Sequence, residues 1–475
     1  MARTIQTCPP QPEGQIQNKD VVIPKPYEIQ VITPLFGGGI EAGKVDPVMP
    51  VRPSGIRGHL RFWWRATRGS KYPDYKELFQ RESEIWGSTE NPSPVTITVS
   101  QKVLSSFREF PRYGFADNSG PESYVIFPAK DKKESLGKEN FSFILNISWL
   151  SQKRLQDIRE KENQRRAKEN KSPKPEHVED IGPDVEAALR AWVNFGGIGA
   201  RTRRGCGALY SPELSFHSIE DAKEYPFQVL YKSGNPGDTP IQTWSNAINV
   251  FRNFRQLRKG GLHTKNIRTR NGVRPITVPK ERSWWPEPDS IRQITGCSLK
   301  PLPTHLNPRM DHSASLTSTQ YFPRAELGLP IIFHFADGPE KWDPPNNDLD
   351  PPESTLIPTK LSEDHRTRKD GTRMASPVIL RPLKLNNGSC LSIYVILQHP
   401  NLPPLRLTGK HPNLPKDLDP NIHVVNEKIA KYLNSPLGPV IPGGTPRSQK
   451  GSALDAFIAY ATEEMPDRNF KEVGK

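Results

Sequence analysis

The chain has 475 residues, 50 of them proline, so we expect two domains with long loops instead of a single core. Lys and Arg outnumber Asp and Glu by 66 to 52, and the formal net charge of +14 indicates a polyanionic partner. There is no long apolar run and no hydrophobic signal segment, which predicts a cytosolic protein. The four cysteines form no C-x-x-C pair, which argues against a zinc finger or a redox motif.

The first half of the chain alternates between strand and helix patterns. β-Branched and aromatic residues predict strands over 27–36, 95–103, 141–149 and 208–216. Helical spacing predicts a helix from a Ser54 cap to Arg68 and another over 185–195. The order strand, helix, strand, strand, helix, strand predicts an α+β, ferredoxin-like domain over 27–218, after an N-terminal extension of residues 1–26. Residues 151–180, dense in both signs of charge, are predicted to form a solvated helical insertion.

The second half predicts an irregular second ferredoxin-like domain over 219–475. An amphipathic helix is expected near 241–259, with Ile241, Trp244, Ile248 and Phe251 on its apolar face. Strands are expected over 329–335, 378–383 and 391–398, and a further helix near 424–433. Residues 336–373 and 399–420 are rich in proline, and the second stretch belongs to a region with two copies of HPNLP, so both are predicted to be exposed loop insertions.

Positive charge gathers first on the helix predicted after Ser54. Arg57, Arg61 and Arg65 recur at helical spacing opposite the apolar face, so they could follow several phosphates of a nucleic acid. Lys44 and Arg52 precede this helix and are expected to line the same groove. The alternative is a network of salt bridges within the chain.

A glycine-rich segment, FGGIGARTRRGCGAL from Phe195, carries the second group of arginines. Glycines let the backbone approach a ligand closely, and Arg201, Arg203 and Arg204 suit phosphate. A dinucleotide site is excluded because Thr202 stands where its fingerprint requires glycine. The alternative is an ordinary tight connection.

The third basic segment, residues 239–280, contains no Asp or Glu. Arg255 and Arg258 lie in it with aromatic residues nearby that could stack on bases. The alternative is a flexible, solvated arm.

Other motifs give weaker signals. Gly38-x4-Gly43-Lys44 approaches a P-loop, but Val45 stands where Ser or Thr must hold magnesium, so we expect no nucleotide cofactor. His59 could serve as the general base of a metal-independent ribonuclease, although a binding or packing role is the more common one. His305 with Asp311 and His312 lacks the spacing of a metal site, so we expect no bound metal.

Several strings resemble the RAMP proteins of CRISPR effector complexes, in particular the family of subunit one of the type III-B Cmr complex. The strings are TPLFGGG from Thr33, RPSGIRGHLRFWWRATRG from Arg52, the FGGIGARTRRG loop, WPEPDSIR from Trp285, FPRAELGLPI from Phe322 and ASPVILRPL from Ala375. The insertions, and Cys206 where an aromatic residue is expected, depart from that family's pattern.

The resemblance implies tandem ferredoxin-like domains and a place at the head of the complex, near the 3′ end of the guide RNA. Guide RNA, target RNA and other Cmr subunits, including an adjacent RAMP subunit, would be the partners, and no membrane would be involved. Target cleavage belongs to another subunit in this family, so the resemblance implies an antiviral RNA-binding subunit that is not an enzyme. The alternatives are a guide-processing endoribonuclease that uses His59, or an assembly scaffold that does not touch RNA.

Overall fold

A computed structural model describes most of the chain as two compact units. Unit 1 comprises Met1–Ile29, Val51–Ser105 and Ser142–Trp192, and unit 2 comprises Gln30–Pro50, Ser106–Phe141 and Val193–Lys475. The described residues are 20–46, 48–89, 91–100, 120–129, 136–137, 139–256, 262–269, 272–279, 285, 287–297, 321–335, 351–361, 368–371, 373–398, 402–415, 417–418 and 452–474. The predicted boundary between residues 218 and 219 stays a prediction.

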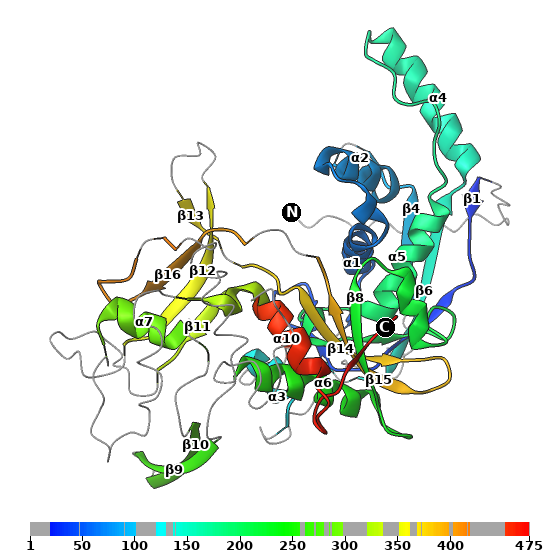
Figure 1. Cartoon of the computed structure of the whole chain (residues 1–475). Helices are drawn as coiled ribbons and strands as arrows, with labels where there is room; N and C mark the ends of the chain where they lie inside the picture. The colour runs from blue at the N-terminus through cyan, green and yellow to red at the C-terminus, as the bar shows by residue number, and fades with distance from the viewer. Residues whose placement is uncertain are drawn as a thin grey trace, which may run out of the picture. The chain divides into compact units, whose positions relative to one another are not determined.

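The sheet of unit 1 is organised by strand β6 (Phe141–Leu150), whose residues are alternately buried and half-exposed. This period of two fits a sheet with one face on a core. β6 pairs antiparallel with β4 (Val95–Ser100) and with the short β1 (Val21–Val22), and β2 (Tyr27–Val31) joins the same sheet. The strands predicted over 141–149 and from residue 95 are therefore confirmed (Figure 1).

The described residues of unit 1 include the helices α1 (Pro53–Ala66), α2 (Tyr75–Trp86), α4 (Gln152–Lys168) and most of α5 (Gly182–Phe195). The predicted Ser54 cap was wrong, because Arg52 precedes the helix and makes no side-chain cap bond. Pro53 begins α1 instead; its fixed φ suits the first turn, where a missing N–H costs nothing. Helix α4 confirms the helical insertion that the sequence predicted.

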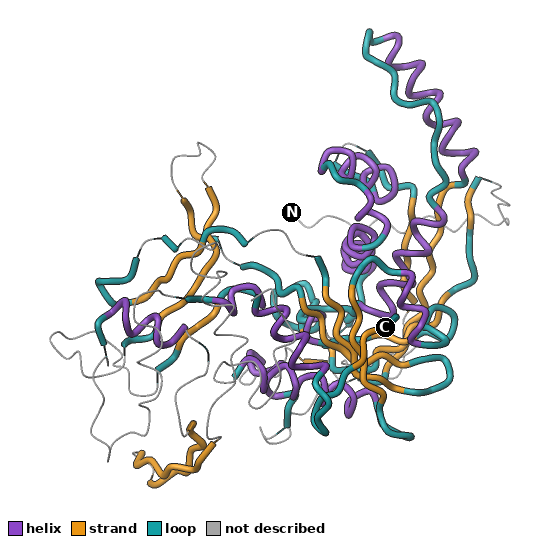
Figure 2. The backbone as a smooth tube through the Cα atoms, viewed as in Figure 1, coloured by secondary structure: helices purple, strands orange, loops and turns teal. Residues whose placement is uncertain are grey.

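Unit 2 contains an antiparallel sheet in the order β14 (Val378–Lys384), β15 (Cys390–Ile396), β8 (Gln228–Ser233) and β17 (Lys471–Glu472). Helix α6 (Pro240–Arg255) packs on β14 and β15 and begins with a capping box between Thr239 and Gln242. Helix α10 (Ala453–Thr462) packs beside α6 (Figure 2). Trp244, Ile248 and Phe251 of α6 are buried in the core cluster, as the amphipathic spacing of the predicted helix required, and they share that cluster with Tyr394 and Phe457.

The proline-rich insertions are not simply exposed loops, and this part of the prediction was wrong. Residues 336–373 include β12 (Ser354–Leu361) and β13 (Arg368–Asp370), and residues 399–420 include β16 (Leu405–Gly409). β12 pairs with β11 (Ile331–Phe333), β13 and β16, and buries Leu356 completely. The sequence did not reveal β12 because Pro358, a residue that is rare inside strands, occupies one of its buried positions.

The remaining elements of unit 2 are short or paired locally. Strands β9 (Leu262–Thr269) and β10 (Gly272–Pro279) form a hairpin within the third basic segment, which is therefore not wholly an unstructured arm. β3 (Leu35–Phe36) pairs with β5 (Leu136–Gly137), and Gln30 and Val31 of β2 pair with β7 (Leu209–Tyr210), much shorter than the predicted strand 208–216. Unit 2 also contains the helices α3 (Ser123–Ile126) and α7 (Glu287–Thr295).

The mixture of helices and antiparallel strands confirms an α+β fold. The tandem ferredoxin-like arrangement stays a prediction, and the helix expected near 424–433 lies outside the described residues. Within the described segments, no helix has both the length and the apolar character that crossing a membrane requires.

Glu326 caps the start of α10 from the short 3-10 helix Pro323–Leu327, where its carboxylate accepts a hydrogen bond from the Leu454 amide at 3.3 Å. The side chain is almost fully buried, and burial raises the pKa of Glu326 to about 7, although hydrogen bonds from Leu454 and Ala453 oppose the shift. The native protein therefore holds a proton that the unfolded chain releases between about pH 4.5 and pH 7.

We predict that the contribution of Glu326 to stability falls as the pH rises from about 4.5 to about 7, since the native state binds the proton more tightly there. Glu326→Gln should remove this dependence and stabilise the protein above pH 7 by at most roughly 3 kcal/mol. Urea unfolding at pH 5 and pH 8 measures the difference. The exposed Glu464→Gln is the control, and an equal pH slope in wild type and Glu326→Gln would contradict the prediction.

Candidate nucleic-acid interface

The glycine-rich loop of unit 2 is held against the segment that follows β2. Gly38 and Gly199 both have positive φ, and a Cβ added at Gly38 would lie 2.9 Å from the Gly199 Cα. The Ala200 amide donates to the Phe36 carbonyl at 2.6 Å, and the Thr33 hydroxyl donates to the Gly205 carbonyl at 2.6 Å. Gly38 and Gly199 therefore let two backbone segments of the protein approach each other closely. The sequence had instead suggested that the glycines let a ligand approach the backbone.

Arg201 lies at the turn of this loop with a φ of +58°, a conformation that is uncommon for a residue with a Cβ. Its guanidinium group lies over the rings of Phe36 and Phe127, 5.7 and 5.8 Å from their centroids. Its buried Nε makes no hydrogen bond, and burial, with a smaller effect of Arg373, lowers the pKa of Arg201. Phe127 is 63% exposed, so an aromatic face and a cation lie together at the surface of unit 2.

Arg203 and Arg204 belong to the 3-10 turn Thr202–Arg204 and donate to backbone carbonyls, Arg203 to Ser376 at 2.6 Å and Arg204 to Val378 at 3.0 Å. Arg204 also lies over the Phe251 ring, and Arg255 contacts the same ring. Burial, followed by repulsion from Arg255, lowers the pKa of Arg204 to about 9. Tyr124 opposes this shift.

We call Arg201, Arg203, Arg204 and Arg255 the guanidinium cluster. Like charges at close range destabilise one another unless an anion neutralises them. The cluster is half-buried, so its field is less screened than that of surface lysines. An anion that bound here would gain both charge neutralisation and the Arg201 donor that the protein leaves without a hydrogen bond.

The arginines of α1 in unit 1 have partners within the chain. Arg61 Nε lies 2.6 Å and Arg65 Nη1 3.0 Å from Glu82 of α2, and the Glu82 side chain is 3% exposed. Arg57 donates to the Ser93 hydroxyl at 2.6 Å and to the Val95 carbonyl at 2.9 Å. The salt-bridge alternative is thus realised for Arg61 and Arg65, and contact of this stripe with RNA stays a prediction.

The other predicted site residues are placed as follows. Lys44 pairs with Glu41 at 2.6 Å, Arg52 is the residue before α1, and Arg258 lies outside the described residues. The α1 stripe and the guanidinium cluster belong to different units, so their convergence on one strand also stays a prediction.

His59 lies on α1, half-buried, and burial lowers its pKa to about 4. Its imidazole is therefore neutral and weakly basic at neutral pH, far from the pKa that suits a general base. Among the described residues, no group of three or more His, Cys, Asp or Glu side chains is arranged to hold a metal ion. His305, Asp311 and His312 lie outside those residues.

Arg381 of β14 is a key residue of this region that the sequence analysis missed. Its fully buried guanidinium group donates to the carbonyls of Val193 and Gly196 at 2.9 and 2.6 Å, and to that of Leu209 at 2.8 Å. Burial lowers the pKa of Arg381 to about 9, and no carboxylate is among these acceptors. The sequence did contain a sign of this role, because Arg381 is the single charged residue in the otherwise apolar run VILRPL.

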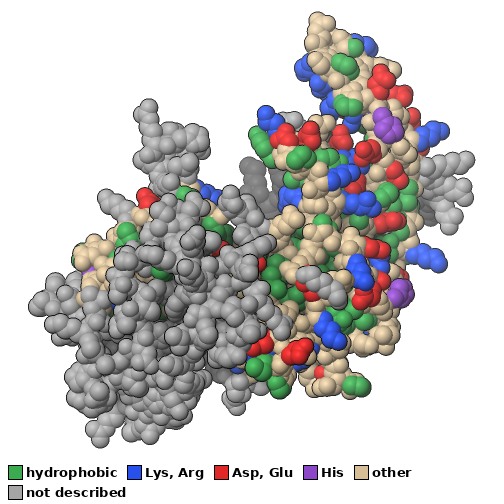
Figure 3. All heavy atoms as spheres, viewed as in Figure 1, with side chains coloured by type: hydrophobic (Ala, Val, Ile, Leu, Met, Phe, Trp, Pro, Cys, Tyr) green, Lys and Arg blue, Asp and Glu red, His purple; other side chains and the backbone are tan. Residues whose placement is uncertain are grey.

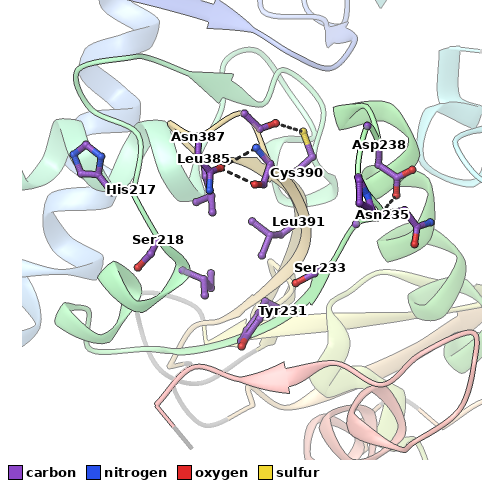
Figure 4. Close-up of a pocket in the computed structure, with 16 residues that line it drawn as sticks. His217, Ser218, Tyr231, Ser233, Asn235, Asp238, Leu385, Asn387, Cys390 and Leu391 are labelled. Carbon is purple, nitrogen blue, oxygen red and sulfur yellow. Dashed lines mark hydrogen bonds between the residues drawn. The ribbon is translucent and has the colours of Figure 1, made fainter.

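A separate pocket of about 780 Å³ in unit 2 lies between the loop after β8 and the turn between β14 and β15 (Figure 4). His217, Asp238, Asn387 and Cys390 are among its lining residues. Lys and Arg are absent from the described side chains that line it, so it lacks the cations that a phosphate site needs.

Part of this chain is similar in sequence to known proteins. Residues 28–210 match the sequence model of the RAMP superfamily. The chain is similar to the CRISPR system Cmr subunit Cmr1-2 of Pyrococcus furiosus, with 24% identity over 190 residues that cover 38% of this chain and 92% of that protein. Identity to subunit Cmr1-1 of the same organism is 28% over 174 residues, which cover 36% of this chain and 43% of that protein.

The similar solved structures are more distant. The crystal structure of Cmr1 from Pyrococcus furiosus in its apo form has a TM-score of 0.40 and 16% identity, over 83% of this chain and 92% of that chain. A chain of the type III-B Cmr-beta complex bound to cognate target RNA has a TM-score of 0.33 and 14% identity, over 80% of this chain and 95% of that chain.

We predict that Glu82→Gln destabilises the protein by roughly 1–2 kcal/mol, because two half-exposed arginines lose the buried carboxylate that neutralises them. Urea unfolding measures the change. Glu77→Gln, at an exposed position of the same helix, is the matched control. Equal stability of the two variants would show that the Glu82 pairs contribute nothing.

We predict that Arg381→Lys costs about 3 kcal/mol or more. The three nitrogens of the guanidinium group reach carbonyls in different directions, whereas the single ammonium nitrogen of lysine leaves at least one of them buried without a donor. The free energy of unfolding in urea is the measurement. Arg406→Lys, at a half-buried position paired with Asp417, should change it by less than about 1 kcal/mol. A loss no greater at Arg381 than at Arg406 would refute this role.

Proposed function

We propose that this protein is an RNA-binding subunit of a type III-B CRISPR effector complex. It lies at the head of the complex near the 3′ end of the guide RNA, beside another RAMP subunit, and holds guide and target RNA for antiviral defence without cutting either. Its two halves are tandem ferredoxin-like domains that meet near residues 218 and 219. The relatives named as Cmr subunits support the assignment to the complex.

The guanidinium cluster is the observation that supports RNA as the ligand. Repulsion within the cluster favours an anion, and Arg201 keeps a buried donor without a hydrogen bond. The exposed ring of Phe127 lies beside Arg201, and a cation next to an aromatic face suits a phosphate and its neighbouring base. Such contacts tolerate any base, so sequence choice falls to pairing between guide and target.

We predict that Arg201→Gln weakens binding of single-stranded RNA and lowers the salt slope of log affinity by about 0.7, as one lost phosphate contact should. Glutamine, like arginine, carries a Cβ, so the strain of the positive φ at this position stays the same. Phe127→Ala should cost about 1–3 kcal/mol of binding if a base stacks there. Fluorescence anisotropy across a salt series measures both effects.

Arg406→Gln is the matched control for Arg201, since Arg406 is paired with Asp417 at 3.3 Å. A wild-type slope near zero would refute electrostatic RNA binding altogether; five phosphate contacts should give a slope near −3.5 by the rule of about 0.7 per contact. Absence of RNA crosslinks to this chain in the assembled complex would favour the scaffold alternative.

The ribonuclease alternative has its own test. Purified protein is incubated with labelled repeat RNA in EDTA, and we expect the RNA to stay intact, because His59 is a weak base. Cleavage that His59→Ala abolishes would overturn the non-catalytic assignment.

A further inference from the structure

Helix α4 and residues 169–181 form a projecting arm in unit 1, which we call the α4 arm (Figure 1). The helix has no broad apolar face, and polar side chains hold the returning segment against it. Asn163 exchanges two hydrogen bonds with the Lys174 backbone, at 3.0 and 2.8 Å, and Gln156 donates to the Glu176 carbonyl at 2.8 Å. Arg159 donates to the Pro175 carbonyl at 2.8 Å.

The residues that hold this segment define one face of α4. Gln152, Gln156, Arg159 and Asn163 recur at intervals of four, three and four residues, so they lie on one side of the helix. The opposite side carries Arg154, Lys161, Arg165 and Lys168 at intervals of seven, four and three. At 1.5 Å per residue this basic stripe runs roughly 21 Å.

The acidic residues of the outer part of the arm are already paired. Between residues 161 and 171 there are five basic residues and two acidic ones. Glu162 pairs with Lys174 at 2.6 Å, and Glu169 pairs with Lys171 at 2.8 Å. Arg165 lies 3.8 Å from Glu169 but keeps 69% of its side chain exposed. Lys and Arg side chains are visible around this outer part (Figure 3).

We propose that this basic stripe of the α4 arm is a second contact for the phosphates of RNA, apart from the guanidinium cluster. The inference rests on the proposed function and extends it to an insertion. The stripe is polar and positively charged, and Ile158 is the one apolar side chain on its face, 42% exposed. Protein interfaces have an apolar or aromatic centre, whereas nucleic-acid interfaces have this polar, basic character.

The test compares two triple variants of the full chain for binding to single-stranded RNA by anisotropy across a salt series. Lys161→Ala, Arg165→Ala and Lys168→Ala together remove the stripe, and alanine favours the helix. Lys223→Ala, Lys410→Ala and Lys471→Ala remove the same charge from exposed positions elsewhere. The arm variant should bind about tenfold or more weakly, with a salt slope lower by about 2, at unchanged helical circular dichroism. The control should bind as wild type does.

Arm and control variants that bind equally well would overturn the proposal, as would an arm variant that binds as wild type. If Arg201→Gln weakens RNA binding and the arm variant does not, the α4 arm proposal fails and the proposed function stands. If wild type itself does not bind RNA, both fail. Loss of an acidic partner subunit from the assembled complex, at unchanged RNA affinity, would identify the stripe as a protein contact and likewise overturn the proposal.

Discussion

The buried guanidinium group of Arg381 is the interaction on which the rest of unit 2 depends. It joins β14 to the end of α5, to the glycine-rich loop and to β7 through carbonyl oxygens of Val193, Gly196 and Leu209. A charge without a carboxylate partner is stable in a core only where several dipoles point at it. Even with its pKa lowered to about 9 it remains charged at neutral pH, so the loop is fixed from within the protein and needs no ligand to form.

The arginines of this chain divide by what neutralises them. Arg61 and Arg65 form salt bridges with a carboxylate, and Arg203 and Arg204 donate hydrogen bonds to backbone carbonyls. These four side chains therefore stabilise the fold even without a ligand. Arg201 has rings on two sides, and no hydrogen bond at its Nε. A ligand that exploits the cluster would therefore meet a surface already in place and held rigid, which reduces the entropy lost on binding.

The sequence predicted what rests on local patterns and missed what rests on distant partners. The alternation in β6 and the amphipathic stripe of α6 placed those elements correctly, because burial repeats every two or 3.6 residues. β12 was missed because prolines disguised its alternation. The glycines were recognised, but their partners in the neighbouring segment could not be foreseen, since close approach depends on chain segments more than 150 residues apart. The sequence could not decide for the same reason whether Arg61 and Arg65 form salt bridges, because their bonds to Glu82 depend on how α1 and α2 pack.

The carbonyls that hold the glycine-rich loop come from residues far along the chain, and this affects how the loop forms during synthesis on the ribosome. Arg203 and Arg204 are made early, but their acceptors on Ser376 and Val378 lie 173 and 174 positions later in the chain. At elongation speeds of about 5–20 residues per second, this delay is of the order of ten seconds or more. Throughout that interval the nascent loop carries its positive charge without these bonds, so the basic surface reaches its final shape only once the second half of the protein has emerged.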